Sequence, residues 1–291
     1  MPGSLYVVAT PIGNLEDLTA RARRILGEVD VIAAEDTRRT SRLLAHVGIS
    51  KPLVSLHAHN EYREAPRLVE RIRAGASVAV VSDAGTPGIS DPGETLVRLC
   101  RQAGLPVIAI PGASAVTAAL SISGLPAIPF TFLGFPPPAG EARTLWFEAL
   151  ADMPGAAVFF EAPHRIRRTL DDLSLVKRQI IVNREISKMY ENSIEWDNSS
   201  RSAPPDVPDR GEFVVVVGPA PKSEPVPVDG KAMLAFVNHL ADLPGLSEDR
   251  ILSAAAAAFQ IPVNRVRTTI KKAKILVKQQ IEQQSHRTGQ S

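Results

Sequence analysis

Residues 82–93 read SDAGTPGISDPG, and this stretch does most to decide the fold. It follows the β-branched run Val78–Val81 and precedes a helical pattern. Its three glycines let the backbone approach a ligand closely, and its two prolines restrict the chain. Because twelve residues are long for a simple connection, we predict a strand, a ligand-binding turn and a helix. The alternative is a turn whose glycines serve backbone geometry alone.

The helix after this turn is expected to begin near residue 91. Asp91 is the predicted N-cap, with Pro92 at the first helical position and Glu94 at the third. Leu96, Leu99, Cys100 and Ala103 form the expected apolar face of this helix.

Length and composition are those of a soluble protein with more than one domain. The 291 residues predict about two domains with an appendage, and 44% hydrophobic with 22% charged residues is ordinary for a globular chain. A net charge of +2 excludes a global field that would draw the whole protein to nucleic acid. Cys100 is the one cysteine, which excludes an internal disulfide and fits a reducing compartment. The strand-like start and the lack of a long apolar run predict a cytoplasmic protein that does not enter a membrane.

Strand and helix patterns alternate along the chain, which predicts an α/β architecture. A first domain, residues 1–123, is expected to hold strands at 5–9, 31–34, 52–56, 78–81 and 107–110. A second α/β domain, residues 124–219, is expected to hold strands at 130–135, 157–160, 180–183 and 213–217, and a basic helix at 164–173. The loop 198–209 is rich in serine and proline and is expected to be exposed. The prolines at 219, 221, 225 and 227 predict a stiff linker over residues 220–230.

Residues 231–291 are helical in pattern. Ser247 and Asn264 are the expected N-caps of two helices joined by a short break, a helix-turn-helix arrangement. The second helix is basic, and its predicted RNA-binding residues are Arg265, Arg267, Lys271, Lys272 and Lys274. The alternative is a solvated lysine face on a small stabilising appendage.

Several kinds of active site are excluded by their missing motifs. The chain has no G-x-G-x-x-G after a strand, no P-loop, no zinc-type cysteine and histidine spacing and no G-x-S-x-G elbow. The nearest metal-like set is HAHNE at 57–61, for which a structural or RNA-facing role is favoured, so no metal is expected.

Four turns that end strands, at 10–14, 35–38, 83–93 and 111–115, are expected to converge. In open α/β sheets ligands bind beyond the carboxyl ends of the strands. The resulting crevice suits a polar ligand with an amino or ribose group, to which Asp83 could make a charge-assisted contact. The residues alone therefore predict a cofactor-binding α/β enzyme.

The turns belong to a longer series of motifs. In order these are LYVVATPIGNLED (5–17), EDTR (35–38), SDAGTPGISDPG (82–93), PGASA (111–115), FLGFPP (132–137), FFEAPHR (159–165) and RGEFVVVV (210–217). Together they closely resemble the ribosomal RNA small subunit methyltransferase I family of the tetrapyrrole methylase superfamily. The resemblance implies a class III methyltransferase fold with two α/β domains and a small C-terminal helical domain. It also implies S-adenosylmethionine as cofactor, the ribose 2′-hydroxyl of a decoding-centre cytidine in 16S rRNA as substrate, and a homodimer.

The resemblance also implies which residues hold the cofactor. Carried over by motif, these are Ile12, Gly13, Asp83, Gly85, Thr86, Ser114, Ala115, Phe160 and Glu161, with Glu212 or Phe213 less securely placed. Asp83 could instead serve only to form its turn.

Methyl transfer to a hydroxyl needs placement of the reactants, and a base or a cation helps the proton to leave. The catalytic candidates are Lys188, Glu35 and Asp36, with Lys188 preferred as an electrostatic aid. Glu185 and His164 are further candidates, and Arg38 and Arg165 are expected to contact RNA phosphate. Each of these could instead form a surface ion pair.

Two departures from the family pattern stand out. The stretch PPPAGE after FLGF lacks the basic residues common there, and REISK at 184–188 replaces R-E-L-T-K. The first departure moves the expected RNA contacts toward the tail. Two alternatives remain open: a relative that methylates a small tetrapyrrole or a protein residue, and an RNA-binding assembly factor with a vestigial pocket.

Overall fold

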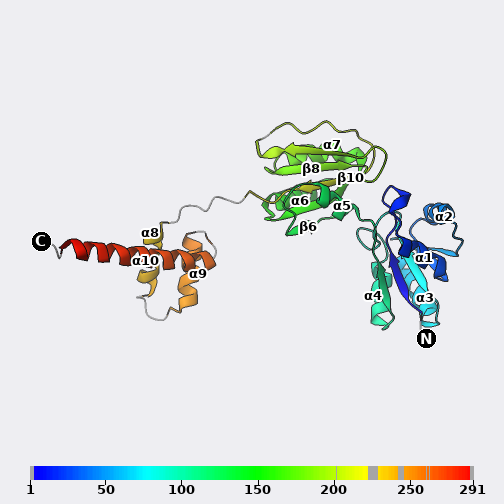
Figure 1. The fold of residues 1–291 in the computed structure, drawn as a ribbon, viewed down its shortest axis with the longest axis horizontal. Helices are drawn as coiled ribbons and strands as arrows, with labels where there is room; N and C mark the ends of the chain where they lie inside the picture. Colours follow the sequence, from blue (N-terminus) through cyan, green and yellow to red (C-terminus); the bar gives the residue numbers. More distant parts are fainter. Residues whose placement is uncertain are drawn as a thin grey trace. The chain divides into compact units, whose positions relative to one another are not determined.

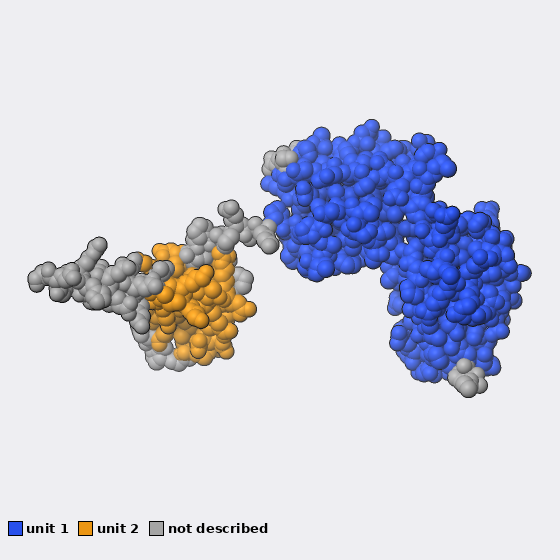
Figure 2. Space-filling view, in the orientation of Figure 1, with its two compact units in different colours: residues 1–221 blue, residues 222–291 orange. Residues whose placement is uncertain are grey.

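The computed structural model describes residues 3–200, 202–221, 229–241, 246–259, 261 and 263–288. The chain forms two compact units, residues 1–221 and residues 222–291 (Figure 2). Most of the expected linker at 220–230 lies outside the described residues, namely residues 222–228 with Pro225 and Pro227. No helix in the described part of the chain is long and apolar enough to cross a membrane.

The first sheet of unit 1 is parallel, and its strands have the order β3-β2-β4-β1-β5. The strands are β1 (Leu5–Val8), β2 (Val31–Ala34), β3 (Leu53–Ser55), β4 (Val78–Val81) and β5 (Val107–Ile110). Apart from Tyr6 and Ser55 they are short runs of Val, Ile, Ala and Leu, as expected for the strands of a sheet covered on both faces. Because all five run in one direction, their carboxyl ends lie along one edge, where the predicted turns begin.

Helices cover both faces of this sheet (Figure 1). They are α1 (Ala20–Glu28), α2 (Thr37–His46), α3 (Glu61–Arg73) and α4 (Glu94–Gln102), with the short η1 (Leu15–Asp17) after β1. Alternate strand residues divide between two cores: Val78 and Val80 pack with α3 and α4, while Ala79 and Val81 pack with α1 and α2. This two-sided burial fixes the register of β4.

The second sheet is mixed and has the order β6-β7-β10-β8-β9. Its strands are β6 (Phe130–Phe132), β7 (Ala156–Glu161), β8 (Gln179–Arg184), β9 (Asn192–Asp197) and β10 (Phe213–Val217). β6 and β7 are parallel, whereas the other neighbouring pairs are antiparallel. One face carries α6 (Glu141–Asp152) and α7 (Ile166–Leu173), preceded by η2 (Pro163–Arg165), and η3 (Asn198–Ser200) follows β9.

The helix α5 (Ala115–Ile122) covers the other face of the second sheet (Figure 1). Its buried residues Val116 and Ala119 pack against Val158 of β7 and Val214 of β10. The expected boundary between residues 123 and 124 therefore follows a helix that already packs on the second sheet. Since β5 ends at Ile110, the short segment before α5 connects the two sheets.

Three local expectations for unit 1 were wrong. Asp91 is not the N-cap of α4: Gly93, with φ of 123°, precedes the first helical residue, Glu94. The edge strand β9 was not expected, because most of its side chains are exposed and polar. Asn198 was placed in an exposed loop but is buried, since its Nδ2 donates to the carbonyl oxygens of Leu173 and Val176 at 2.8 Å each.

Unit 2 holds the helices α8 (Gly230–Ala241), α9 (Glu248–Ala258) and α10 (Val263–Thr288). Their small apolar core contains Met233, Leu252, Ala255, Ile261, Val266 and Ile270. Ser247 is the N-cap of α9 but makes no capping hydrogen bond through its side chain. The expected N-cap at Asn264 is wrong, because α10 already begins at Val263. The pair of helices predicted from the sequence thus packs with a third, α8.

Candidate active site

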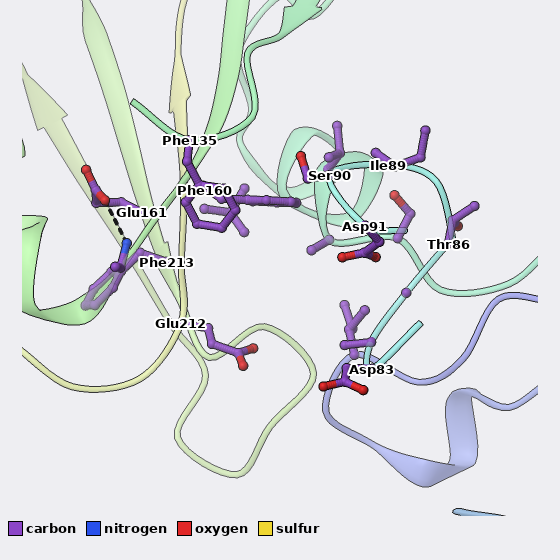
Figure 3. A pocket seen from close by; sticks show the side chains of 18 of the residues that line it. Asp83, Thr86, Ile89, Ser90, Asp91, Phe135, Phe160, Glu161, Glu212 and Phe213 are labelled. Atoms are coloured by element: carbon purple, nitrogen blue, oxygen red, sulfur yellow. Dashed lines mark hydrogen bonds between the residues drawn. The ribbon is translucent and has the colours of Figure 1, made fainter. Parts of the chain in front are cut away.

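A cavity of about 350 Å³ lies in unit 1 where the carboxyl ends of the first sheet face the second sheet (Figure 3). The predicted cofactor-binding residues that line it are Ile12, Asp83, Gly85, Thr86, Ser114, Ala115, Phe160 and Glu161. Its volume is in the range of pockets that enclose a small organic ligand. The turns that the sequence predicted to converge do meet at this cavity.

Backbone pairing holds the first and third turns together. Thr10 and Gly85 form an antiparallel bridge with N–H···O distances of 2.9 and 3.0 Å. Gly85 has φ of +83°, and a Cβ there would lie 3.3 Å from Cγ2 of Ile12. Thr86 Oγ1 donates to the carbonyl oxygen of Ala113 at 3.2 Å, which ties the same turn to the segment before α5. The glycine is therefore required by both backbone conformation and space.

One wall of the cavity carries three carboxylates, from Glu35, Asp83 and Asp91. The backbone N–H of Asp83 donates to Glu35 Oε2 at 3.2 Å, and the Asp36 N–H donates to Asp83 Oδ1 at 3.0 Å. Burial raises the pKa of Asp91 to about 6, and the charges of Glu35 and Asp83 add to this rise. The wall is thus strongly negative, with one cation, the Arg39 guanidinium, 3.4 Å from Asp83 Oδ2. In the described part of the chain no group of acidic, histidine or cysteine side chains is arranged to hold a metal.

The opposite wall is apolar and comes from the second sheet and its loops. Figure 3 shows Phe135, Phe160 and Phe213 on this side, across the cavity from Asp83 and Asp91. The rings of Phe135 and Phe160 meet edge to face with their centroids 5.5 Å apart. Such a wall suits a flat heteroaromatic ring.

The N-terminus of α5 forms a third side of the cavity. Ser114 is the N-cap and makes no capping hydrogen bond through its side chain, and Ser114, Ala115 and Val116 all line the cavity. The first amides of a helix carry partial positive charge and bind anions. The cavity therefore presents three surfaces to one ligand: the backbone amides at the start of α5, the wall of carboxylates and the wall of phenylalanine rings.

Two of the predicted cofactor residues, Glu161 and Gly13, make close contacts with other parts of the protein. Glu161 lines the cavity, but its carboxylate lies in a buried ion cluster: Arg165 Nη2 is 2.6 Å from Oε1, and Thr169 and Arg143 approach Oε2. Its Oε1 also accepts the Ala162 N–H at 2.7 Å, the bond dashed in Figure 3. Gly13 does not line the cavity. It lies beneath the side chain of Lys188, whose Cγ would be 2.3 Å from a Cβ at Gly13.

The three predicted catalytic residues occupy different environments. Glu35 lines the cavity, whereas Asp36 caps α2 and binds Arg38 through both carboxylate oxygens, at 3.1 and 2.8 Å. The hydrogen bond from the Arg38 side chain lowers the pKa of Asp36 well below its usual range. Asp36 is therefore a poor proton acceptor.

Lys188 lies beside the cavity, on the loop between β8 and β9, and this loop contacts Gly13 and Asp17 of the first half of unit 1. Its Nζ lies 2.8 Å from Glu185 Oε1 and 2.9 Å from Glu212 Oε2, and Glu212 lines the cavity. Burial lowers the pKa of Lys188, but the hydrogen bonds to the two carboxylates outweigh burial and raise it overall. Lys188 is thus a fixed cation and not a base. Glu185 and Ser187 have φ of 56° and 70°, and Ser187 Oγ is hydrogen-bonded to Asp17 of the first half.

The predicted RNA-binding residues are mostly on the surface. Arg38 is exposed and paired with Asp36. On α10, Lys271, Lys272 and Lys274 are exposed, Arg265 is half-buried, and Arg267 lies 3.4 Å from Asp249 of α9.

Several residues that line the cavity were not among the predicted site residues, and three of them carry the argument. Asp91 was read only as a helix cap, Phe135 only as part of a family motif, and Arg39 was not singled out. The signal for Arg39 was its place next to EDTR, one residue beyond the quoted motif.

Comparison with known proteins assigns the family. Residues 4–198 match the family described as Tetrapyrrole (Corrin/Porphyrin) Methylases. The chain is 46% identical to the ribosomal RNA small subunit methyltransferase I of Xylella fastidiosa over 245 residues, which is 82% of this chain and 90% of that protein. It is 41% identical to the protein of the same name from Pseudomonas aeruginosa, over 89% of this chain and 92% of the relative. The chain belongs to the ribosomal RNA small subunit methyltransferase I family. Members of this methyltransferase family use S-adenosylmethionine.

Solved structures agree with the family at the level of the fold. The methyltransferase CobJ aligns with a TM-score of 0.56 and 21% identity, covering 75% of this chain and 95% of its own. Diphthine synthase aligns with a TM-score of 0.57 and 16% identity, covering 74% and 90%. A uroporphyrin-III C-methyltransferase from Thermus thermophilus, solved with S-adenosyl homocysteine, aligns with a TM-score of 0.51 and 20% identity, covering 74% and 97%. This chain thus shares its two-sheet architecture with these differently named enzymes.

Proposed function

We propose that this protein transfers a methyl group from S-adenosylmethionine to a ribose 2′-hydroxyl of 16S rRNA, at a cytidine of the decoding centre. Membership of the ribosomal RNA small subunit methyltransferase I family supports rRNA as the substrate. The observation that carries the proposal is the cavity with its anionic wall, aromatic wall and helix N-terminus. These three surfaces complement a ligand that combines positive charge, an adenine ring and a carboxylate.

The residues at the cavity fit this cofactor. Phe135 and Phe160 provide the surface for the adenine ring, and the amides at the start of α5 provide donors for the carboxylate. Asp83 and Asp91 provide acceptors for the ammonium group or the ribose hydroxyls. The positive φ of Gly85 keeps this side free of a side chain.

The chain's own residues position the acceptor and take up its proton. S-adenosylmethionine supplies, when bound, a methyl group on a sulfonium whose sulfur keeps the bonding electron pair as the hydroxyl oxygen forms the new C–O bond. Glu35 is the one of the three predicted catalytic residues that lines the cavity, and it is the carboxylate we assign to accept the hydroxyl proton. Lys188 adds a fixed positive charge near Glu212.

The decisive experiment combines binding and mapping. Calorimetry should show saturable binding of S-adenosylmethionine, and rRNA from cells lacking the protein should lose one ribose methylation. Binding without any change in ribose methylation would contradict the proposed substrate. The absence of saturable binding would instead support an assembly factor with a vestigial pocket.

We also propose that the protein acts as a homodimer in the cytoplasm. Support comes from exposed apolar residues between the end of α5 and the start of the edge strand β6: Ile122, Ile128 and Phe130 are 48%, 94% and 44% exposed. Light scattering at micromolar concentration tests the dimer, and a monomer would contradict it.

A further inference from the structure

A second cavity, of about 230 Å³, lies beside the first in unit 1. It is lined by Thr10, Pro11, Leu15, Arg39, Thr40, Arg42, Leu43, Ser82 and Asp83. Arg39 and Asp83 line both cavities, so a single ion pair forms part of their common wall. A group bound in the second cavity is therefore a near neighbour of the donor site.

The inner surface of this second cavity is largely uncharged. Pro11, Leu15 and Leu43 supply apolar contacts. Thr10 and Thr40 are buried, and the Thr10 hydroxyl already donates to the Ser82 carbonyl oxygen at 3.2 Å. These apolar side chains fit the flat face of a base or the carbon skeleton of a sugar, and the charged residues that line the same cavity are Arg39, Arg42 and Asp83.

The rim carries two guanidinium groups from one face of α2. Arg39 and Arg42 are three residues apart, so their side chains are neighbours on the helix. Arg42 is exposed and makes no hydrogen bond or ion pair with any residue that the structure describes. The Arg39 side chain is 62% exposed, and among the residues that the structure describes its guanidinium pairs with one carboxylate oxygen, Asp83 Oδ2. By contrast, Arg38 on the same helix is held by Asp36. Two guanidinium groups with unused donors are a site for phosphate.

We infer that this second cavity binds the acceptor nucleotide of the RNA, with its sugar and base against Pro11, Leu15 and Leu43 and its phosphate on Arg39 and Arg42. The inference rests on the proposed function, because the shared wall places the acceptor beside the donor. It assigns substrate recognition near the reacting atoms to α2 and to the turn after β1. The tail of the chain then contributes further RNA contacts.

Two substitutions test this site, and a third is the control. Arg42→Ala removes a guanidinium that binds phosphate, and Leu15→Trp fills the cavity from a loop position that is 43% exposed and therefore tolerates a larger side chain. Arg71→Ala removes an exposed arginine of α3 that lines neither cavity. Each variant is measured for S-adenosylmethionine affinity by calorimetry and for methylation of small ribosomal subunits at several salt concentrations.

We expect Arg42→Ala to raise the KM for the subunit about tenfold, with kcat and donor affinity within about twofold of wild type. The slope of log KM against log salt concentration should fall by about 0.7 to 0.9, the range expected when one phosphate is no longer neutralised. Leu15→Trp should lower kcat/KM for the subunit by at least about tenfold and leave donor affinity unchanged, while Arg71→Ala should match wild type.

Three results would count against these assignments. If wild type is active and both variants methylate as well as wild type, the second cavity is not the acceptor site. If the variants lose donor affinity as much as activity, the cavity belongs to the donor. If wild type binds the donor but methylates no rRNA, the proposed function itself fails.

Discussion

Gly85 shows how one residue connects backbone conformation with ligand binding. Its φ of +83° disfavours any other residue, and a Cβ would also lie 3.3 Å from Cγ2 of Ile12 in the cavity wall. We expect Gly85→Ala to lower the free energy of unfolding by about 1–2 kcal/mol and to weaken S-adenosylmethionine binding about tenfold. Denaturant unfolding and calorimetry measure the two effects.

Gly88 provides a matched control on the same turn. It has φ of +79°, but nothing lies within 4 Å of a Cβ built there. Gly88→Ala should therefore cost similar stability and leave the affinity for the donor nearly unchanged. Equal losses of affinity in both variants would show that backbone strain, and not contact with Ile12, governs binding.

Asp91 makes both stability and donor binding depend on pH. Burial, together with Glu35 and Asp83, raises its pKa from 3.8 to about 6, so the folded protein holds a proton that the unfolded chain releases. This group therefore makes the protein less stable as pH rises from about 4 to 6. A cationic donor favours the ionised carboxylate, so we expect donor affinity to fall as pH drops below about 6.

Asp91→Asn tests this titration. The variant should show a weaker pH dependence of unfolding between about pH 4 and 6 and a smaller loss of donor affinity on acidification. Asp171→Asn, at an exposed position of α7, is the control and should behave as wild type. An unchanged pH profile in Asp91→Asn would assign the titration to another carboxylate of the wall.

At the scale of elements, a distant carboxylate caps the helix that follows the glycine-rich turn. Glu61, at the start of α3, accepts hydrogen bonds through Oε1 from the backbone N–H groups of Gly93, Thr95 and Leu96 at 3.0, 2.9 and 3.2 Å. It satisfies amides that the local sequence leaves without a cap, and its charge complements the helix dipole. Glu61 thus fixes the end of the turn that carries Asp83 and Asp91.

We expect Glu61→Gln to lower the free energy of unfolding by about 1–3 kcal/mol, because a buried, charge-assisted acceptor becomes neutral. Glu64→Gln on the same helix is the control. The Glu64 side chain is 14% exposed and pairs with Arg63 and Arg67, whose side chains are exposed, and pairs with such solvated partners contribute less than about 1 kcal/mol. Chemical denaturation of both variants compares the two effects, and equal losses would rule out a special role for Glu61.

The sequence predicted elements whose pattern is local and missed features that depend on distant residues. Strands such as Val31–Ala34 and Val78–Val81 were predicted with their observed bounds, because a strand buried on both faces is a continuous apolar run. The strand β9 was missed because it is an edge strand in which Trp196 is the one buried residue. Asp91 was misassigned because the residue that caps α4, Glu61, lies more than thirty positions earlier in the chain.

The same distinction between local and distant residues applies to the candidate site. Turns that follow strands could be placed at one sheet edge, since parallel strands end together. The ion partners of Glu161 and Lys188 could not be foreseen, because they come from other elements, namely Arg165 of η2 and Glu212 of the segment before β10. The second cavity depends on Leu15 of η1 and Arg39 of α2 lining the same space, which no local sequence pattern indicates.

At the scale of the whole molecule, the proposed function divides donor binding and RNA retention between the two units. Every residue of the donor cavity belongs to residues 1–221. The core of unit 2 is formed by its own helices, α8, α9 and α10. Its α10 carries Lys271, Lys272 and Lys274 on the surface, which suits attraction to RNA phosphate.

A chain that ends at Pro221 should therefore keep S-adenosylmethionine affinity within about twofold of the full chain and lose most methylation of small ribosomal subunits. A full-length variant with Lys271→Gln, Lys272→Gln and Lys274→Gln removes the charge of the tail and keeps its helices. We expect this variant to have a raised KM for the subunit. The slope of log KM against log salt concentration should fall by about 0.7 to 0.9 for each phosphate that is no longer neutralised. If this variant matches wild type while the truncated chain is inactive, the tail acts through shape and not through charge. Equal loss of donor binding and methylation on truncation would show that unit 1 does not fold without unit 2, and circular dichroism of the truncated chain detects that case directly.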